Sequence, residues 1–405
     1  MPSALPDGEP APADGRLPAA ALGSVPNGSL SAYVHVPFCV TRCGYCDFNT
    51  YTAAELGGLS QQTYVDAVRS EIELAHSVLG AAPALDTVFF GGGTPTLLPP
   101  DQQVGVLAAL DDAFGLAPGC EVTTEANPES VSPQQLELLR AGGVNRISFG
   151  MQSATPHVLA TLDRHHTPGR VAAAVTEART AGFDNVSVDL IYGTPGETVD
   201  EWAATVEAAL ALRPDHVSAY ALIVEPGTAL ARRIARRELA DVDDDDQAEK
   251  YEVADDLLTD AGLTWYEVSN WSTSDTTRCR HNLRYWQGAN WWGFGPGAHS
   301  HVGGVRWWNV KHPAAYASQL ASGASPAAGR EVLDDRTRST EQVLLEVRLR
   351  DGLLIDALDP TGRQTSAQLA AEGLLDRTSL AGGRVVLTLR GRLLADLVVR
   401  RLLDA

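Results

Sequence analysis

The chain has 405 residues, of which 44% are hydrophobic, and its formal net charge at pH 7 is −20. This length predicts one large domain and a small one, with a sizeable buried core. The acidic charge argues against nucleic acids and anionic membrane surfaces as partners, because both attract clustered positive charge. No apolar run reaches the roughly 18 residues that a membrane-spanning helix needs.

Residues 1–29 are rich in Pro, Ala and Gly and show no apolar periodicity. They also lack the basic start and the apolar core of a secretory signal. We therefore predict a disordered leader and a cytoplasmic protein.

Six short runs rich in β-branched and aromatic residues follow, and they predict buried strands. Segments with helical periodicity separate them, and this alternation predicts a parallel sheet with helices on its outer face. The predicted fold class is α/β, with a partial TIM-type (β/α)6 barrel over 30–240. The predicted strands are 33–38, 87–91, 121–126, 146–152, 185–192 and 216–222, and the predicted helices are 60–79, 102–114, 133–141, 169–181 and 199–212.

The pattern changes after the sixth strand. An acidic run at 241–246 precedes a predicted helix at 247–261, and we interpret it as a solvated helix start rather than a metal site. Seven of the eight tryptophans then lie within 265–308. We predict a helical, tryptophan-rich extension over 241–330.

A small C-terminal unit is predicted over 336–405. Its pattern is a helix at 340–349, a second at 366–372, a short hairpin that ends at 385–389, and a last helix at 391–403. This order predicts a winged-helix-like module. Its charges are mixed, so we interpret it as a packing or docking unit.

Three of the five cysteines, Cys39, Cys43 and Cys46, lie within eight residues, directly after the first predicted strand. In a long chain without a secretory signal, such a cluster indicates metal binding rather than disulfides. Three thiolates at this spacing can hold three corners of a cuboidal cluster and leave one iron open to a small molecule, whereas Fe–S and zinc sites usually take four ligands. A zinc site with His35 as the fourth ligand is the alternative.

The C-x3-C-x-aromatic-C pattern, with Tyr45 as the aromatic residue, resembles the signature of radical S-adenosylmethionine (SAM) proteins. Its surroundings resemble the oxygen-independent coproporphyrinogen III oxidase-like family, over about residues 31–400. The resemblance implies a [4Fe-4S] cluster on the three cysteines, with SAM chelating the open iron, and a C-terminal domain of the family's type. It also implies an electron donor such as flavodoxin or ferredoxin. The cofactors carry the radical chemistry, and the protein binds and orients them.

Polar and glycine-rich segments follow the predicted strands at the edge where α/β folds place their chemistry. The Gly91-Gly-Gly-Thr-Pro segment lets a ligand approach the backbone closely, and the planar fork of an arginine suits a carboxylate. The family has Gly where this chain has Asp163. The positions that match the family's SAM contacts are Tyr33, Tyr45, Gly92, Gly93, Thr94, Glu125, Gln152, Arg164, Asp189 and Ala221. Ion pairing of Glu125 with an arginine, and core packing of Tyr33 and Ala221, are the structural alternatives.

Two branches of this family compete, the coproporphyrinogen III oxidases and the HemW-type haem chaperones. The oxidase motif has a further Cys two positions after the third, where this chain has Phe48. The hexapeptide at 281–286 matches the chaperones' HNxxYW motif, and the resemblance implies haem contacts at His281, Tyr285 and Trp286. Imidazole is a common haem ligand. Cys279 is either a haem-linked or a plain buried thiol.

The expected function is therefore that of a haem chaperone that binds haem, one [4Fe-4S] cluster and SAM and passes haem to an acceptor protein, with coproporphyrinogen III oxidation as the alternative. SAM cleavage is compatible with this function, whereas coproporphyrinogen dehydrogenation is not expected. Peripheral contact with membrane-bound haem proteins is compatible with it. His299, in a glycine-rich loop, aligns with the oxidase's second SAM site, but we expect this loop to shape the cavity mouth.

Overall fold

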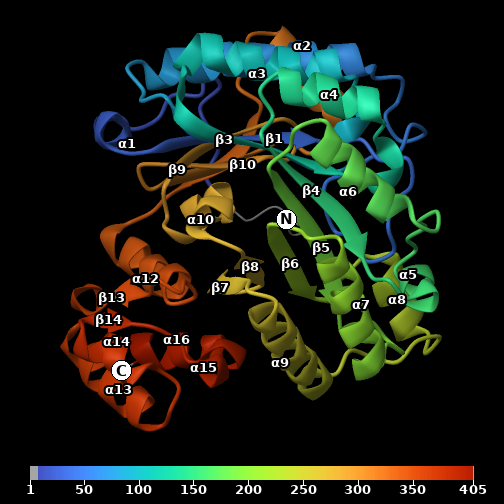
Figure 1. Cartoon of the computed structure of the whole chain (residues 1–405). Helices are drawn as coiled ribbons and strands as arrows, with labels where there is room; N and C mark the ends of the chain where they lie inside the picture. The colour runs from blue at the N-terminus through green and yellow to red at the C-terminus, as the bar shows by residue number, and fades with distance from the viewer. Residues whose placement is uncertain (1–7, 405) are drawn as a thin grey trace.

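A computed structural model describes residues 8–404 of the chain (Figure 1). Six strands, β1 to β6, lie side by side in chain order, and each pairs in parallel with the next. The predicted partial (β/α)6 barrel is confirmed, with boundaries shifted by a few residues. The strands are β1 Leu30–Val36, β2 Leu85–Gly92, β3 Leu116–Ala126, β4 Arg146–Gln152, β5 Asn185–Tyr192 and β6 His216–Ala221.

Helices follow the strands and cover the outer face of the sheet, as Figure 1 shows. The first is typical: Ser60 caps it by accepting a hydrogen bond from the amide of Thr63, and its inward face buries Tyr64, Val68 and Ile72. The outer helices are α2 Gln61–Leu79, α3 Pro100–Phe114, α4 Pro133–Ala141, α6 Arg170–Thr180 and α7 Val199–Ala211. Two short helices, α5 Pro156–Thr161 and α8 Ala229–Ala235, pack instead beside the cysteine loop, in a small apolar cluster of their own.

The tryptophan-rich extension continues the barrel sheet at both edges. β9 pairs in parallel with β1 and leads to the antiparallel strands β10 to β12, and β8 and β7 continue antiparallel from β6. The extension was predicted as helical. It contains three helices, α9 Asp244–Asp260, α10 Arg280–Trp286 and α11 Pro313–Ala321, and also six strands, β7 Thr264–Glu267, β8 Asn270–Ser272, β9 Asn290–Phe294, β10 His299–Val302, β11 Val305–Asn309 and β12 Ala327–Val332.

The prediction of a disordered leader is wrong for residues 8–29, and residues 1–7 lie outside the described residues. Glu9 and Arg330 exchange both backbone hydrogen bonds at the edge of β12, at 2.9 Å each. Helix α1, Ala19–Ser24, and the turn after it bury Ala21 and Val25 against the main core. These apolar contacts offset the ordering cost of a short segment.

The C-terminal residues pack around a core of their own. The predicted helices are present, and the last one is split. The end of the predicted hairpin, 385–389, pairs antiparallel with residues 374–376, but a short helix, Arg377–Ala381, lies between them in place of a tight turn. β13 pairs with β14 across two intervening helices, so the strand pair is not a local turn. The elements are α12 Asp335–Glu346, β13 Leu353–Leu354, α13 Pro360–Ala371, α14 Arg377–Ala381, β14 Arg384–Val385, α15 Leu389–Leu393 and α16 Ala395–Leu403.

Among residues 8–404, no helix combines the length and the apolar character required to cross a membrane.

Candidate cofactor site

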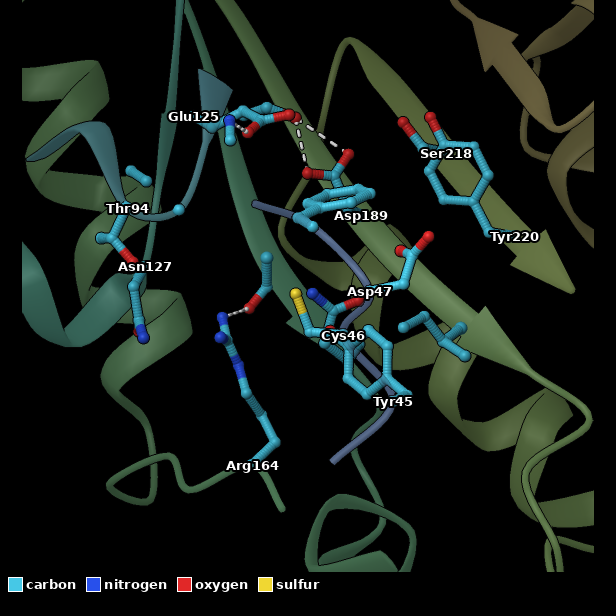
Figure 2. Close-up of a pocket in the computed structure, with 18 of the residues that line it drawn as sticks. Tyr45, Cys46, Asp47, Thr94, Glu125, Asn127, Arg164, Asp189, Ser218 and Tyr220 are labelled. Atoms are coloured by element: carbon cyan, nitrogen blue, oxygen red, sulfur yellow. Dashed lines mark hydrogen bonds between the residues drawn. The ribbon is translucent and has the colours of Figure 1, made fainter. Parts of the chain in front are cut away.

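The carboxyl ends of the barrel strands surround a cavity of about 500 Å³. Nine of the ten predicted SAM positions line it, and only Tyr33 does not. Cys46 also lines the cavity. Figure 2 shows Glu125 and Asp189 at one end of this pocket and Arg164 at the other, with Cys46 between them. Motifs that are spread over more than 180 residues of sequence thus lie together at the carboxyl end of the barrel.

The loop that carries the cysteines is joined directly to the glycine segment after β2. The amide of Gly93 donates to the carbonyl of Val36 and that of Thr94 to the carbonyl of Phe38, both at 2.8 Å. A Cβ atom on residue 93 would lie 2.5 Å from the Phe38 carbonyl oxygen, so only glycine allows this approach. Close contact between the two loops places the three thiols beside the cavity.

A second contact reaches the cysteines from the opposite wall. Arg164 donates from Nη1 to the Sγ atom of Cys43 at 3.5 Å and from Nη2 to the carbonyl of Gly150 at 3.1 Å. The planar guanidinium can also donate paired hydrogen bonds to the carboxylate of a ligand in the cavity. The predicted arginine is therefore positioned to serve both the cluster and a ligand on it.

The zinc alternative does not fit this geometry. His35, the proposed fourth ligand, is buried, and both of its ring nitrogens are engaged: Nδ1 with the Tyr33 hydroxyl at 3.1 Å and Nε2 with the Asn49 carbonyl at 2.9 Å. Among the described residues, no three His, Cys, Asp or Glu side chains are grouped to share one metal ion. Three separate thiols with no fourth side-chain ligand fit a cuboidal cluster, in which each thiolate binds a different iron.

Two half-buried carboxyl groups face the cavity at the ends of β3 and β5. Glu125 accepts a hydrogen bond from the Gly92 amide at 3.2 Å, and its pKa is raised to about 8, first by burial and then by the charge of Asp189. Asp189 accepts from the Ser148 hydroxyl at 2.9 Å, and burial raises its pKa as well. Such groups are suited to a cationic ligand, because a positive charge stabilises their ionised forms.

Gln152 lies in the left-handed region, with φ of 66°, beside an irregularity in the pairing of β4 with β5. Non-glycine residues seldom adopt this conformation, and where they do, the strain is often functional. Its side chain lines the cavity.

Several lining residues were missed by the motif-based prediction. Arg146, Ser148, Gly150 and Gln152 are alternate residues of β4, and all four line the cavity. The two-residue period of a strand predicts that they share a face, so this signal was present in the sequence. The lining residues that the prediction did not name are Asp47, Phe89, Ala126, Asn127, Arg146, Ser148, Gly150, Ile191, Ser218, Tyr220, Leu222, Ile223, Glu225 and Asn282.

The three predicted haem contacts lie on α10, beneath the cavity rather than in it. His281 is buried and not among the lining residues; its Nδ1 atom lies 2.7 Å from the Thr87 hydroxyl and its Nε2 atom 2.9 Å from the Tyr285 hydroxyl. Burial lowers its pKa to about 3, so the ring is neutral. The ring of Tyr285 also packs edge-on against Trp291, and Trp286 is half-buried at the end of α10 and is not among the lining residues. In this conformation His281 therefore has no free nitrogen for iron.

The structure also places two other residues that the sequence singled out, Cys279 and His299. Cys279 lines the cavity but is buried, and its thiol lies 3.8 Å from a carboxylate oxygen of Glu121. The glycine-rich loop before His299 packs behind the cysteine loop: the side-chain amide of Asn49 donates to the carbonyl of Pro296 at 3.0 Å. His299 is not among the lining residues, so this loop supports the cysteine loop instead of shaping the cavity mouth.

Comparison with known proteins agrees with this geometry. The model of the radical SAM superfamily matches residues 33–209. The chain is 55% identical over 382 residues to the haem chaperone HemW of Mycobacterium tuberculosis. The matched region spans 94% of this chain and 97% of the relative. The chain is 32% identical over 380 residues to HemW of Bacillus subtilis, covering 90% and 97% of the two chains. Among solved structures, coproporphyrinogen III oxidase HemN of Escherichia coli matches with a TM-score of 0.78 and 23% identity, over 95% of this chain and 91% of that one, and this likeness concerns the fold.

Proposed function

Because the chain belongs to the HemW family of radical SAM proteins, we propose that it acts as a haem chaperone, which binds haem, a [4Fe-4S] cluster and SAM and passes haem to an acceptor protein. The observation that carries the proposal is the 55% identity to a haem chaperone over nearly the full length of both chains. Phe48 supports it, because the oxidase branch has a cysteine at this position.

In this proposal Cys39, Cys43 and Cys46 hold the cluster, and the cavity holds SAM. When bound and reduced, the cluster supplies the electron that can cleave SAM. The protein's own part is binding and orientation. Glu125 and Asp189 would face the cationic groups of SAM, Arg164 its carboxylate, and the backbone of 92–94 its amino acid end.

The remaining SAM positions differ in how directly they would act. Tyr45, Gln152 and Ala221 line the cavity, so we assign them to the nucleoside part of SAM. Tyr33 is half-buried, is not among the lining residues and hydrogen bonds to His35, so we assign it a positioning role.

The proposal further divides the chain into a barrel over 30–240, an extension over 241–330 and a docking domain over 336–405. It assigns reduction of the cluster to a small carrier such as flavodoxin or ferredoxin, and it sets the protein in the cytoplasm, where it contacts membrane-bound haem proteins peripherally.

The test uses anaerobically reconstituted protein. We expect about four irons and four sulfides per chain, a Soret shift on titration with haem, and no protoporphyrinogen when coproporphyrinogen III, SAM and a reductant are supplied. Cys46→Ala removes the iron, whereas Cys120→Ala, which changes a buried thiol that is not among the lining residues, keeps it. Formation of protoporphyrinogen would show that the protein is an oxidase instead of a chaperone. Absence of haem binding would contradict the proposed function.

A further inference from the structure

Three large apolar side chains are exposed at the rim of the cavity. Phe48, Tyr220 and Ile223 all line it, and they expose 46%, 43% and 68% of their surface. They come from separate segments: the cysteine loop, the end of β6, and the loop after β6. An exposed apolar group that surrounds the entrance of a cavity indicates a binding surface, because such groups are normally buried in a core.

The rim is held in place by polar contacts behind it. The amide of Leu222 donates to the Tyr192 carbonyl at 2.8 Å, and the side chain of Gln247 on α9 donates to the Leu222 carbonyl at 2.8 Å. A preformed surface loses little conformational entropy when it binds a rigid ligand.

The chemistry of the rim limits the kind of ligand. The cavity lining, taken over the described residues, includes neither His nor Met, the neutral side chains that most often bind haem iron. Asp47 and Glu225 also line the cavity, and their negative charges would repel a carboxylate placed beside them. The ligand that suits this surface is large, flat and apolar, with any carboxylates directed to solvent.

We propose that Phe48, Tyr220 and Ile223 form the seat of the porphyrin macrocycle. The ring binds by its apolar face across the cavity rim, with its propionates in solvent. This inference rests on the proposed function, since it assumes that the chain binds haem, and it names the surface that does so. The seat lies beside the SAM cavity, whereas the HNxxYW helix lies under it.

The experiment titrates the reconstituted protein, with and without SAM, with haem and with metal-free protoporphyrin IX. Ile223→Asp and Phe48→Asp should each weaken the binding of both porphyrins by about tenfold or more, because each places a charge against the macrocycle. Val40→Asp is the matched control: Val40 is 78% exposed on the same cysteine loop but is not among the lining residues, so porphyrin binding should not change. Iron content and circular dichroism verify that each variant folds and keeps its cluster.

The possible outcomes distinguish failure of the porphyrin seat from failure of the proposed haem-chaperone function. If wild-type protein binds neither porphyrin, the proposed function fails. If it binds haem but not protoporphyrin IX, or if both Asp variants bind haem like wild type, the function stands and the seat is overturned. Loss of SAM binding with unchanged porphyrin binding would assign the three side chains to SAM instead, and would also overturn the seat.

Discussion

The Nδ1 atom of His281 lies 2.7 Å from the Oγ1 atom of Thr87, and this hydrogen bond joins α10 to β2 under the cavity. Thr87 donates its own hydrogen to Ser31 at 2.9 Å, so the proton of the shared bond belongs to Nδ1 of His281. The lone pair of Nε2 then accepts from the Tyr285 hydroxyl at 2.9 Å. The four side chains form one buried row across β1, β2 and α10.

Replacing His281 with Ala should therefore destabilise the fold instead of removing an iron ligand. The change opens a cavity, removes the donor that the buried Thr87 hydroxyl accepts from and leaves the Tyr285 hydroxyl without its acceptor, for a cost of about 2–5 kcal/mol. Thermal unfolding should shift down by several degrees, while the Soret position of the haem complex stays that of wild type. A wild-type melting curve together with a displaced Soret band would restore His281 as a haem ligand. Tyr285→Phe, which removes only one of the hydrogen bonds, should show a smaller thermal shift.

The surroundings of His281 also show which features of the site could be predicted from the sequence and which could not. The hexapeptide at 281–286 was recognised from its residue types, but residue types do not reveal whether a ring nitrogen is already used. That depends on Thr87, which lies 194 positions away in the chain. The parallel strands were predictable because strands buried on both faces form largely apolar runs, as in β1, where every residue except Tyr33 is buried.

The strands of the extension and the leader were not predictable in the same way. β7 to β12 have three to six residues each, which is too short for a clear period. β9 exists as a strand because β1 offers it a free edge, and residues 8–10 are ordered because Arg330 pairs with Glu9 across the chain. Both are long-range contacts that local propensity does not contain.

SAM affinity should depend on pH through Glu125. The pKa of this half-buried carboxyl is about 8, so at neutral pH it is largely protonated, and a bound cation must displace its proton. Affinity should rise with pH, by at most about tenfold per unit below pH 8, and level off above it. Glu125→Gln should bind more weakly and lose most of this slope, whereas Glu73→Gln on the exposed face of α2 should keep it. Equilibrium dialysis of labelled SAM from pH 6 to 9 measures the affinity and its dependence on pH. A wild-type affinity that does not change with pH would contradict the assignment of Glu125.

Gly93→Ala should loosen the cysteine loop. The added methyl group would lie 2.5 Å from the Phe38 carbonyl oxygen and 3.0 Å from that of Val36, both of them backbone atoms that cannot turn away. Relief of such overlap costs about 1–3 kcal/mol and moves the two loops apart. The variant should lose iron faster than wild type when a chelator is added, as absorbance of the cluster would record. Gly23→Ala, in α1 with no atom within 4 Å of its new methyl group, is the control, and equal rates in both variants would refute the expected role of Gly93.

Arg392 should anchor the C-terminal domain to α9. Its guanidinium binds Asp255 with both Nη atoms, at 2.9 and 2.7 Å, and lies 4.4 Å from the centre of the Trp265 ring. The pair is largely buried, and loss of one partner leaves the other charge uncompensated, at a cost of about 3–5 kcal/mol. Because Asp255 keeps only the indole of Trp271 as a donor, at 2.8 Å, we expect Arg392→Ala to release the domain before the barrel unfolds.

Limited proteolysis should then cut the Arg392→Ala variant near residues 333–336, at a denaturant concentration that leaves wild type intact. Arg401→Ala removes an ion pair that lies within the C-terminal domain, with Glu372 in an exposed position, and should leave the cutting pattern unchanged. If both variants are cut alike, the anchor is not Arg392. If only Arg392→Ala is cut, and Asp255→Asn in the same chain adds little further effect, the two side chains act as one contact, because coupled partners lose their interaction only once.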